Sequence, residues 1–156
     1  MRKDEFVFEK TVYLADTNAE GNVYFAKYLE WQGTAREEFF RRNVPEHMKI
    51  LSSGIRLITA NAWMVYHSEC RLFDEVKIEV KTSNLKGLSL ELVFTFTNET
   101  TGKLSGRGGE KLAFADKDGQ LIQIPRSITE NAKRFLIERA PELAEIGMRK
   151  GGTVSA

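Results

Sequence analysis

The sequence predicts an α+β fold in which one long helix packs against an antiparallel sheet of about five strands. Two observations support this expectation. Residues 24–43 carry apolar and aromatic side chains at helical spacing, with few β-branched residues between them. Beyond residue 54 the chain is rich in β-branched and aromatic residues and alternates apolar with charged side chains in several stretches. A strand, a long helix and then a meander of strands indicates a helix layered on a sheet.

The N-terminal half supplies the first strand and the helix. Residues 5–14 are rich in β-formers and predict a strand, and turn-forming residues follow at 15–22. We expect the helix to end at Asn43, because the nearby Pro45 disfavours helical backbone in the residue before it. Gly33 inside a helix costs about 1 kcal/mol relative to alanine, which suggests that something packs closely there.

The C-terminal half supplies the remaining strands and a short helix. Residues 46–54 are expected to form a short helix or loop, and strands are expected within 55–72, 76–87, 88–100 and 103–114. Asp118-Gly119 is a turn signal. Residues 127–139 are expected to form a helix with Ser127 as N-cap and Glu130 at the capping-box position. An exposed edge of such a sheet is an aggregation hazard that a second copy of the chain would cover.

Composition sets the broad class of protein. The 156 residues include 23 Lys plus Arg and 22 Asp plus Glu, so no bulk charge favours nucleic acid or an anionic membrane. The single cysteine, Cys70, suits a reducing cytosol, and no apolar stretch approaches a membrane span or a secretory signal. We therefore expect a cytoplasmic protein with one domain over 1–147 and a flexible tail over 148–156.

One segment carries recognisable chemistry. It reads LADTNAEGNVYF from Leu14 to Phe25 and continues to Tyr28 and Arg36 on the helix. This segment resembles the signature of the hotdog-fold 4-hydroxybenzoyl-CoA thioesterase family. Residues 67–76 and 124–128 resemble later motifs of the same family, so that the likeness extends over about 5–137. The resemblance implies a hotdog fold, a thioesterase activity without metal or organic cofactor, and a homodimer or homotetramer.

One departure from that pattern points to a branch of the family. Asn18 stands where most of these enzymes carry a second, catalytic aspartate. The run around it resembles the thioesterases that work beside iterative polyketide synthases, including the enediyne type. That likeness implies hydrolysis of a β-keto or polyene acyl thioester from an acyl-carrier protein, with Asn18, Tyr28 and Arg36 in the site. Four further residues are expected to bind substrate: Gly21, Tyr24, Trp31 and Trp63.

Elementary chemistry gives these residues plausible roles. A thioester is already activated, so its hydrolysis requires a positioned water and a stabilised oxyanion more than a strong base. The backbone N–H of Phe25 at the helix start would be an oxyanion donor worth about 3–4 kcal/mol. Asn18 is neutral, so it can hold water or contact the carbonyl but cannot act as a carboxylate nucleophile. Arg36 remains charged and would bind the oxyanion or a β-keto oxygen.

The spacing of these residues predicts a shared site. Arg36 lies about 16 Å along the helix axis from Phe25, at 1.5 Å per residue. The two therefore cannot easily serve one carbonyl within one protomer. If the helices of two protomers run antiparallel, Arg36 of one approaches Asn18 of the other at the dimer interface.

Structural readings compete with each of these assignments. Asn18 is also a common turn residue, Arg36 a common solvated helix charge, and Tyr28 and the tryptophans common core residues. His47, expected in a surface segment, and His67 lack a catalytic motif, Cys70 has no adjacent base, and no metal-ligand spacing is present. Gly106-Arg107-Gly108-Gly109 indicates a bulge or close backbone approach. Two other functions stay open: a thioesterase for acyl- or aryl-CoA, and a non-catalytic acyl-binding hotdog protein.

Overall fold

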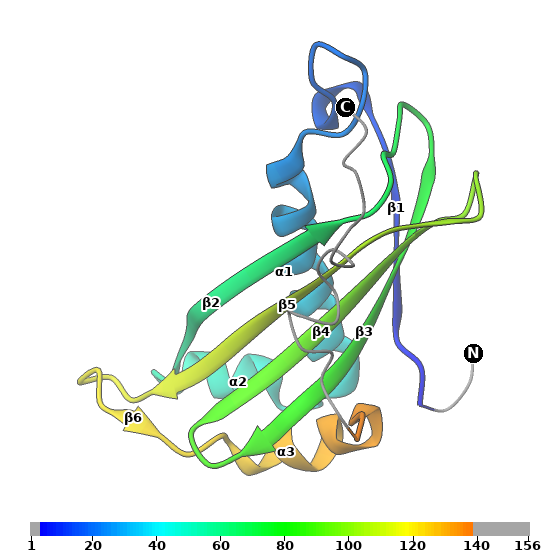
Figure 1. Ribbon diagram of the computed structural model, residues 1–156. Coiled ribbons are helices and arrows are strands. Elements are labelled where there is room, and N and C mark those ends of the chain that lie inside the picture. Colours follow the sequence, from blue (N-terminus) through cyan, green and yellow to red (C-terminus); the bar gives the residue numbers. More distant parts are fainter. Residues whose placement is uncertain (1–3, 139–156) are drawn as a thin grey trace, which may run out of the picture.

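Within residues 4–138, which the computed structural model describes, the chain forms a six-stranded antiparallel sheet and one long helix (Figure 1). The sheet order is β1-β3-β4-β5-β2, and β6 pairs with β5. This arrangement confirms the predicted α+β class, with one short strand more than expected. The elements are β1 (Val7–Thr11), η1 (Leu14–Asp16), α1 (Phe25–Asn43), α2 (His47–Ser52), β2 (Arg56–Tyr66), β3 (Glu75–Lys86), β4 (Ser89–Asn98), β5 (Lys103–Ala115), β6 (Leu121–Ile122), α3 (Arg126–Ala132) and η2 (Lys133–Phe135).

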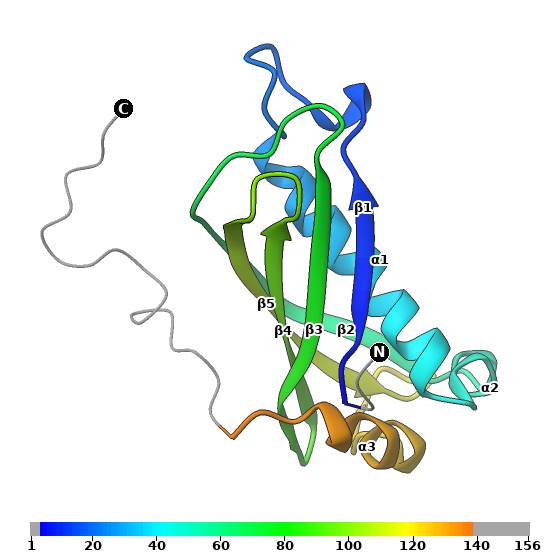
Figure 2. The same cartoon turned by 90° about the vertical axis from the view of Figure 1, so that its right-hand side faces the viewer.

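The core lies between α1 and one face of the sheet. Figure 2 shows α1 running along that face, with β1 beside it and α3 near one end. The predicted alternation of β3 is confirmed, because Val76, Ile78 and Val80 are buried while the lysines and glutamates between them face the other side. Phe94 and Phe96 extend the same buried surface from β4. The apolar stripe of α1 therefore has a matching apolar sheet face.

The glycine run of β5 permits two close approaches, one on each face of the sheet. A Cβ added at Gly108 would stand 1.9 Å from Gln32 Nε2 of α1. A Cβ added at Gly109 would stand 2.5 Å from the indole nitrogen of Trp63. The predicted close backbone approach is confirmed. Because adjacent residues of a strand face opposite sides, Trp63 lies on the sheet face away from α1.

The long helix begins at Phe25 and ends at Asn43, as predicted from Pro45, although Tyr24 is its N-cap rather than its first residue. One expectation for this helix is wrong. Among the described residues, a Cβ added at Gly33 would meet no atom within 4 Å. Gly33 therefore does not mark a close contact within the described part of the protomer.

The predicted cap of the C-terminal helix is also wrong. The helix α3 begins at Arg126, with Pro125 as N-cap at φ −51° and ψ 133°, and it has no side-chain cap hydrogen bond. Proline fixes this backbone geometry before a helix, so Ser127 falls inside the first turn. The helix ends at Ala132 and continues as η2 to Phe135. Residue 139 of the expected helix and the predicted tail at 148–156 lie outside the described residues.

Two edges of the sheet differ in length and exposure. β1 is shorter than the predicted strand 5–14, because the Val12 N–H and C=O bond to the turn at Asp74 and Phe73. β2 bonds to β5 on one side and, within residues 4–138, has no strand on its other side. Residues 59–62 in the middle of β2 are exposed. None of the helices in that same range is long and apolar enough to cross a membrane.

Candidate functional site

Asn18 lies in a tight loop between η1 and α1. An isolated antiparallel bridge joins Thr17 to Val23 across this loop. Within it, the Asn18 N–H donates to the Asn22 carbonyl at 2.9 Å, and the Gly21 N–H donates to the Asn18 carbonyl at 3.0 Å. Gly21 has φ +84°, a left-handed backbone conformation that glycine adopts readily. The loop therefore holds the Asn18 backbone in a defined place.

The side chain of Asn18 has one occupied end and one free end. Its Oδ1 accepts the Glu20 N–H at 3.0 Å. Because only the oxygen of an amide accepts such a bond, this contact also fixes which end is the NH2 group. Among the described residues, Nδ2 of Asn18 has no hydrogen-bond partner. The amide can thus donate to a substrate oxygen, while its acceptor end serves the turn.

Asp16 fixes the entry to the helix. Its carboxylate accepts the Tyr13 N–H at 2.9 Å and pairs with Lys10 at 3.1 Å, and its carbonyl accepts the Tyr24 N–H at 2.9 Å. These contacts give Asp16 a structural role in the turn. With Tyr24 as N-cap, the Phe25 N–H at the first helical position has no acceptor in the described part of the chain. The positive end of the helix dipole lies at the same point.

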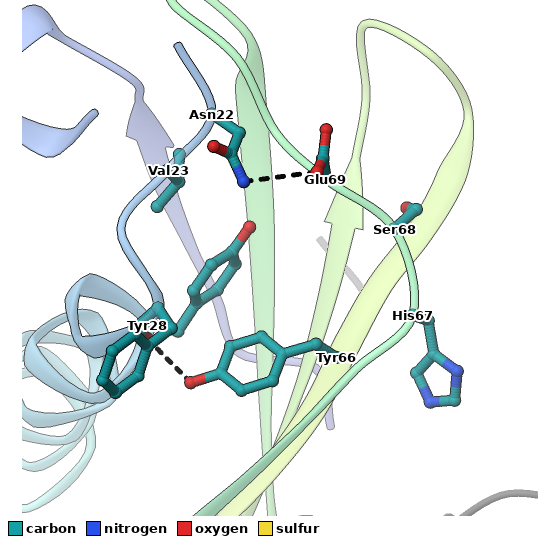
Figure 3. Close-up of a pocket in the computed structure, with 8 residues that line it drawn as sticks. Asn22, Val23, Tyr28, Tyr66, His67, Ser68 and Glu69 are labelled. Atoms are coloured by element: carbon teal, nitrogen blue, oxygen red, sulfur yellow. Dashed lines mark hydrogen bonds between the residues drawn. The ribbon is translucent and has the colours of Figure 1, made fainter. Parts of the chain in front are cut away.

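A pocket of about 290 Å³ opens beside this helix start. It lies between the first turn of α1 and the chain leaving β2, and Figure 3 shows the Tyr28 hydroxyl directed toward Asn22 within it. Tyr66 donates its hydroxyl to the Phe25 carbonyl at 2.7 Å, which ties the helix start to the end of β2. The residues lining the pocket are Asn22, Val23, Phe25, Tyr28, Tyr66, His67, Ser68 and Glu69.

Tyr28 is a buried residue with its hydroxyl at the pocket. Its ring packs 5.3 Å from Tyr66 and 5.6 Å from Phe96, measured between centroids. Burial raises the pKa of Tyr28 above its ordinary value, and the neighbouring Cys70 thiol adds to this effect. The phenol therefore stays protonated at neutral pH and serves as a hydrogen-bond donor rather than as a base.

Arg36 lies farther along α1, away from this pocket. Its Nη1 donates to Glu110 Oε2 of β5 and to Thr59 Oγ1 of β2, both at 3.1 Å. Its Nε and Nη2 donate to Glu37 Oε1 at 3.2 and 3.1 Å. The structure thus brings Phe25 and Tyr28 together at the pocket, leaves Asn18 in the loop before α1 and outside the lining residues, and holds Arg36 under the middle of β2. Arg36 is an anchored cation rather than a freely solvated one.

The remaining predicted substrate-binding residues are spread over the molecule. Gly21 and Tyr24 belong to the loop and cap that lead into α1. Trp31 is buried against Tyr28, with ring centroids 5.2 Å apart. Trp63 lies on the sheet face opposite α1, over Gly109. Neither tryptophan lines the pocket beside Phe25, and their predicted part in acyl binding stays a prediction.

The two histidines have different surroundings. His47, expected at the surface, is buried and stacks on Phe40 at 5.3 Å, because α2 folds back over α1. Its Nε2 lies 3.8 Å from a Glu37 oxygen. His67 borders the pocket, but Figure 3 shows its ring turned away from Tyr28 and Tyr66. Residues 4–138 contain no group of three His, Cys, Asp or Glu placed to hold a metal ion.

Sequence reasoning missed two residues of this region, Glu110 and Tyr66. A signal for Glu110 was present in the strand pattern. Gly106, Gly108, Leu112 and Phe114 all face α1 at alternate positions of β5, and Glu110 shares that parity. A carboxylate on the core face of a strand is uncommon and indicates a partner. Tyr66 carried no such signal, because its bond to Phe25 depends on the approach of two distant segments.

The fold and this site together define a hotdog-fold thioesterase class: a long helix on a curved antiparallel sheet, with a polar loop at the helix start. The sequence pattern of the Thioesterase-like superfamily matches residues 12–140, and the chain belongs to that superfamily.

Individual relatives agree with this family. The acyl-CoA thioester hydrolase YbgC of Escherichia coli is 30% identical over 84 residues, which are 54% of this chain and 61% of the relative. The 1,4-dihydroxy-2-naphthoyl-CoA hydrolase of Thermosynechococcus vestitus is 25% identical over 119 residues, 76% of each chain. The match to YbgC thus spans about three fifths of that relative.

Solved structures give a longer match. The dynemicin thioesterase, studied for induced-fit and allosteric effects upon polyene binding, superposes with a TM-score of 0.81 at 29% identity. The superposition covers 86% of this chain and 99% of that one.

Proposed function

We propose that the protein is an acyl thioesterase whose substrate carbonyl binds at the start of α1. The observation that carries this proposal is the unoccupied Phe25 N–H at a pocket of about 290 Å³, with the unoccupied Asn18 NH2 in the loop that leads into the same helix. Both would donate to the oxyanion that forms when water adds to the thioester carbonyl. The carbon–sulfur bond then breaks, and the proton lost by water ends on the thiol that leaves.

Position 18 of this loop carries no carboxylate that could act as a nucleophile. Asn18 is neutral, and Asp16 is committed to the Tyr13 N–H and to Lys10. The mechanism therefore relies on a positioned water and on electrostatic stabilisation of the oxyanion. In many enzymes this stabilisation supplies most of the rate enhancement. The phenol of Tyr28, whose pKa burial raises further above neutrality, adds a third donor from the pocket wall.

The guanidinium that completes the site comes from a second protomer in this proposal. Arg36 binds Thr59 on β2, and β2 is the longer of the two edge strands of the sheet in the described range. Antiparallel pairing of β2 with its copy would run the Thr59 end of one strand toward the Tyr66 end of the other. That arrangement moves each Arg36 toward the other protomer's helix start. The active form is therefore a homodimer, or a homotetramer built from two such dimers.

A mixed-dimer experiment tests this sharing. Asn18→Ala and Arg36→Ala each remove one half of every site, so either homodimer should be inactive. Co-expressed with distinct tags and purified as the mixed species, they should regain about half of the wild-type activity, because one of the two sites then has both residues. Absence of rescue in a mixed dimer of normal stability would contradict the shared site.

The substrate we infer is a β-keto or polyene acyl thioester carried on the acyl-carrier protein of an iterative polyketide synthase. The Asn18 pattern and the likeness to the dynemicin thioesterase support this choice. The enzyme would act in the cytoplasm, where such synthases work. The aromatic lining of the pocket, Phe25, Tyr28 and Tyr66, suits a flat conjugated chain.

A second candidate is hydrolysis of acyl- or aryl-CoA, favoured by the likeness to YbgC and to the dihydroxynaphthoyl-CoA hydrolase. Steady-state kinetics with the same acyl group on CoA and on a carrier protein separates the two. A kcat/KM at least about tenfold higher on the carrier protein supports the first proposal, and the reverse order supports the second. Binding without hydrolysis on either carrier, unchanged in an Asn18→Ala, Arg36→Ala double variant, would indicate a non-catalytic acyl-binding protein.

A further inference from the structure

Glu110 is a buried carboxylate directly beneath the proposed catalytic arginine. Its side chain is 4% exposed and faces α1 from the middle of β5. Its Oε2 accepts a hydrogen bond from Arg36 Nη1 at 3.1 Å. A glutamate in this position loses its hydration and regains favourable interactions only from the partner it holds. Because such pairs contribute little net stability, the pair requires another explanation.

The guanidinium of Arg36 has a fixed end and an exposed end. Nη1 spends both of its N–H groups on Glu110 and Thr59, two residues that belong to the sheet. Nε and one N–H of Nη2 bind Glu37, whose side chain is 52% exposed and lies on the same helix. Of the five N–H groups of an arginine, one on Nη2 is left free. An incoming oxyanion can also displace Glu37, but not the buried Glu110.

We propose that Glu110 is the positioning residue that fixes Arg36 of the thioesterase site at the β2 edge. This inference rests on the proposed function, because it gives Arg36 its part in catalysis. Glu110 itself does not touch substrate. It holds the Nη1 end of the guanidinium so that the Nη2 end points to the place where the partner's substrate carbonyl would lie. A displacement of about 1 Å from such a geometry can lower a rate about 100-fold.

Protonation of Glu110 would weaken this hold, so the proposal has a pH signature. Burial raises the pKa of Glu110, Arg36 opposes this rise and Glu37 adds to it. His47 is the other titratable group nearby. Its Nε2 lies 3.8 Å from Glu37 Oε2, the carboxylate oxygen that does not bind Arg36. As pH falls through the raised pKa of Glu110, the carboxylate becomes neutral and kcat should fall. The plot of kcat against pH should therefore have an acid limb, a fall in kcat at low pH. Its midpoint should lie above the ordinary pKa of a glutamate carboxyl, which is about 4.3.

The test compares Glu110→Gln with Glu37→Gln in the full-length enzyme, with octanoyl-CoA as substrate and thiol release as the readout. Both variants remove a carboxylate that binds the same guanidinium, but only one removes the buried anchor. For Glu110→Gln we expect kcat to fall about 10- to 100-fold, KM to change less than about twofold, and the acid limb to disappear. Glu37→Gln, which also breaks the His47 contact, should keep the limb and most of kcat.

Further variants separate the ways in which this inference can fail. If Glu110→Gln does not fold, Glu110→Asp replaces it; a shorter carboxylate should keep the acid limb and lower kcat. An acid limb that is unchanged in Glu110→Gln, or lost equally in Glu37→Gln, overturns the role of Glu110. If Arg36→Ala retains full activity, the proposed function fails instead. Loss of activity in Arg36→Ala with no effect of Glu110→Gln overturns only the present inference.

Discussion

At the scale of single residues, the two ends of the Asn18 amide have separate tasks. Its oxygen accepts the Glu20 N–H and shapes the turn, a task that aspartate performs equally well. The NH2 end has no counterpart in aspartate. The side chain thus combines an acceptor that the turn uses with a donor that no described residue occupies.

The substitution Asn18→Asp separates these two tasks. The turn should survive, because the carboxylate still accepts the Glu20 N–H, so the midpoint of thermal unfolding should change by less than about 2 °C. The donor to the oxyanion is replaced by a negative charge, and kcat should fall at least about 100-fold. Steady-state kinetics and calorimetry on one preparation test both statements. Full activity in Asn18→Asp would show that the neutral amide is not required.

Gly108 and Gln32 form a second pair whose contact can be tested. A Cβ at position 108 would stand 1.9 Å from Gln32 Nε2 and 2.9 Å from the Trp63 carbonyl. Gln32 is fully buried and donates to that carbonyl at 3.1 Å. Gly108→Ala should therefore lower the free energy of unfolding by about 1–3 kcal/mol in urea denaturation. Adding Gln32→Ala to that variant should recover part of the loss, and additive losses would contradict this contact.

At the scale of secondary-structure elements, the bounds of α1 were predictable from the sequence. The cap of α3 and the long-range partners of Glu110 and Tyr66 were not. Pro45 and the helical periodicity identify Phe25–Asn43, because both act within the segment itself. The cap of α3 was mispredicted because Ser127 and Glu130 match a capping box, while Pro125 just before them sets the backbone first. The partners of Glu110 and Tyr66 lie 74 and 41 residues away in the chain, so no local pattern identifies them.

Gly33 provides a prediction about α1 as an element. No described atom lies within 4 Å of the added Cβ, so alanine should fit and restore the helix propensity that glycine lacks. Gly33→Ala should raise the free energy of unfolding by about 1 kcal/mol and the unfolding midpoint by about 2–4 °C. Gly21→Ala is the matched control, because its φ of +84° should make the same change destabilising. A destabilised Gly33→Ala would indicate that another subunit packs at this position.

At the scale of the whole molecule, the arrangement of the sheet explains why the site residues divide into two groups. Phe25 and Tyr28 border the pocket at one end of α1, while Arg36 is held about 16 Å along the axis by residues of β5 and β2. The sequence spacing alone predicts this separation. The sheet adds a direction, because Thr59 places the guanidinium at the one long strand that lacks a second neighbour within residues 4–138.

This arrangement makes the free edge of β2 the expected dimer interface. Lysines on an edge strand oppose pairing with another strand, so Ala60→Lys together with Ala62→Lys should convert the assembly to a monomer of 17.8 kDa by light scattering. Both alanines are exposed, so the fold should persist in circular dichroism. Thioester hydrolysis should fall at least about 100-fold, because Arg36 and Asn18 then belong to separate molecules. Thr101→Lys, in the exposed turn after β4, adds a lysine away from the edge and should remain assembled and active. A monomeric double variant with full activity would show that one protomer suffices.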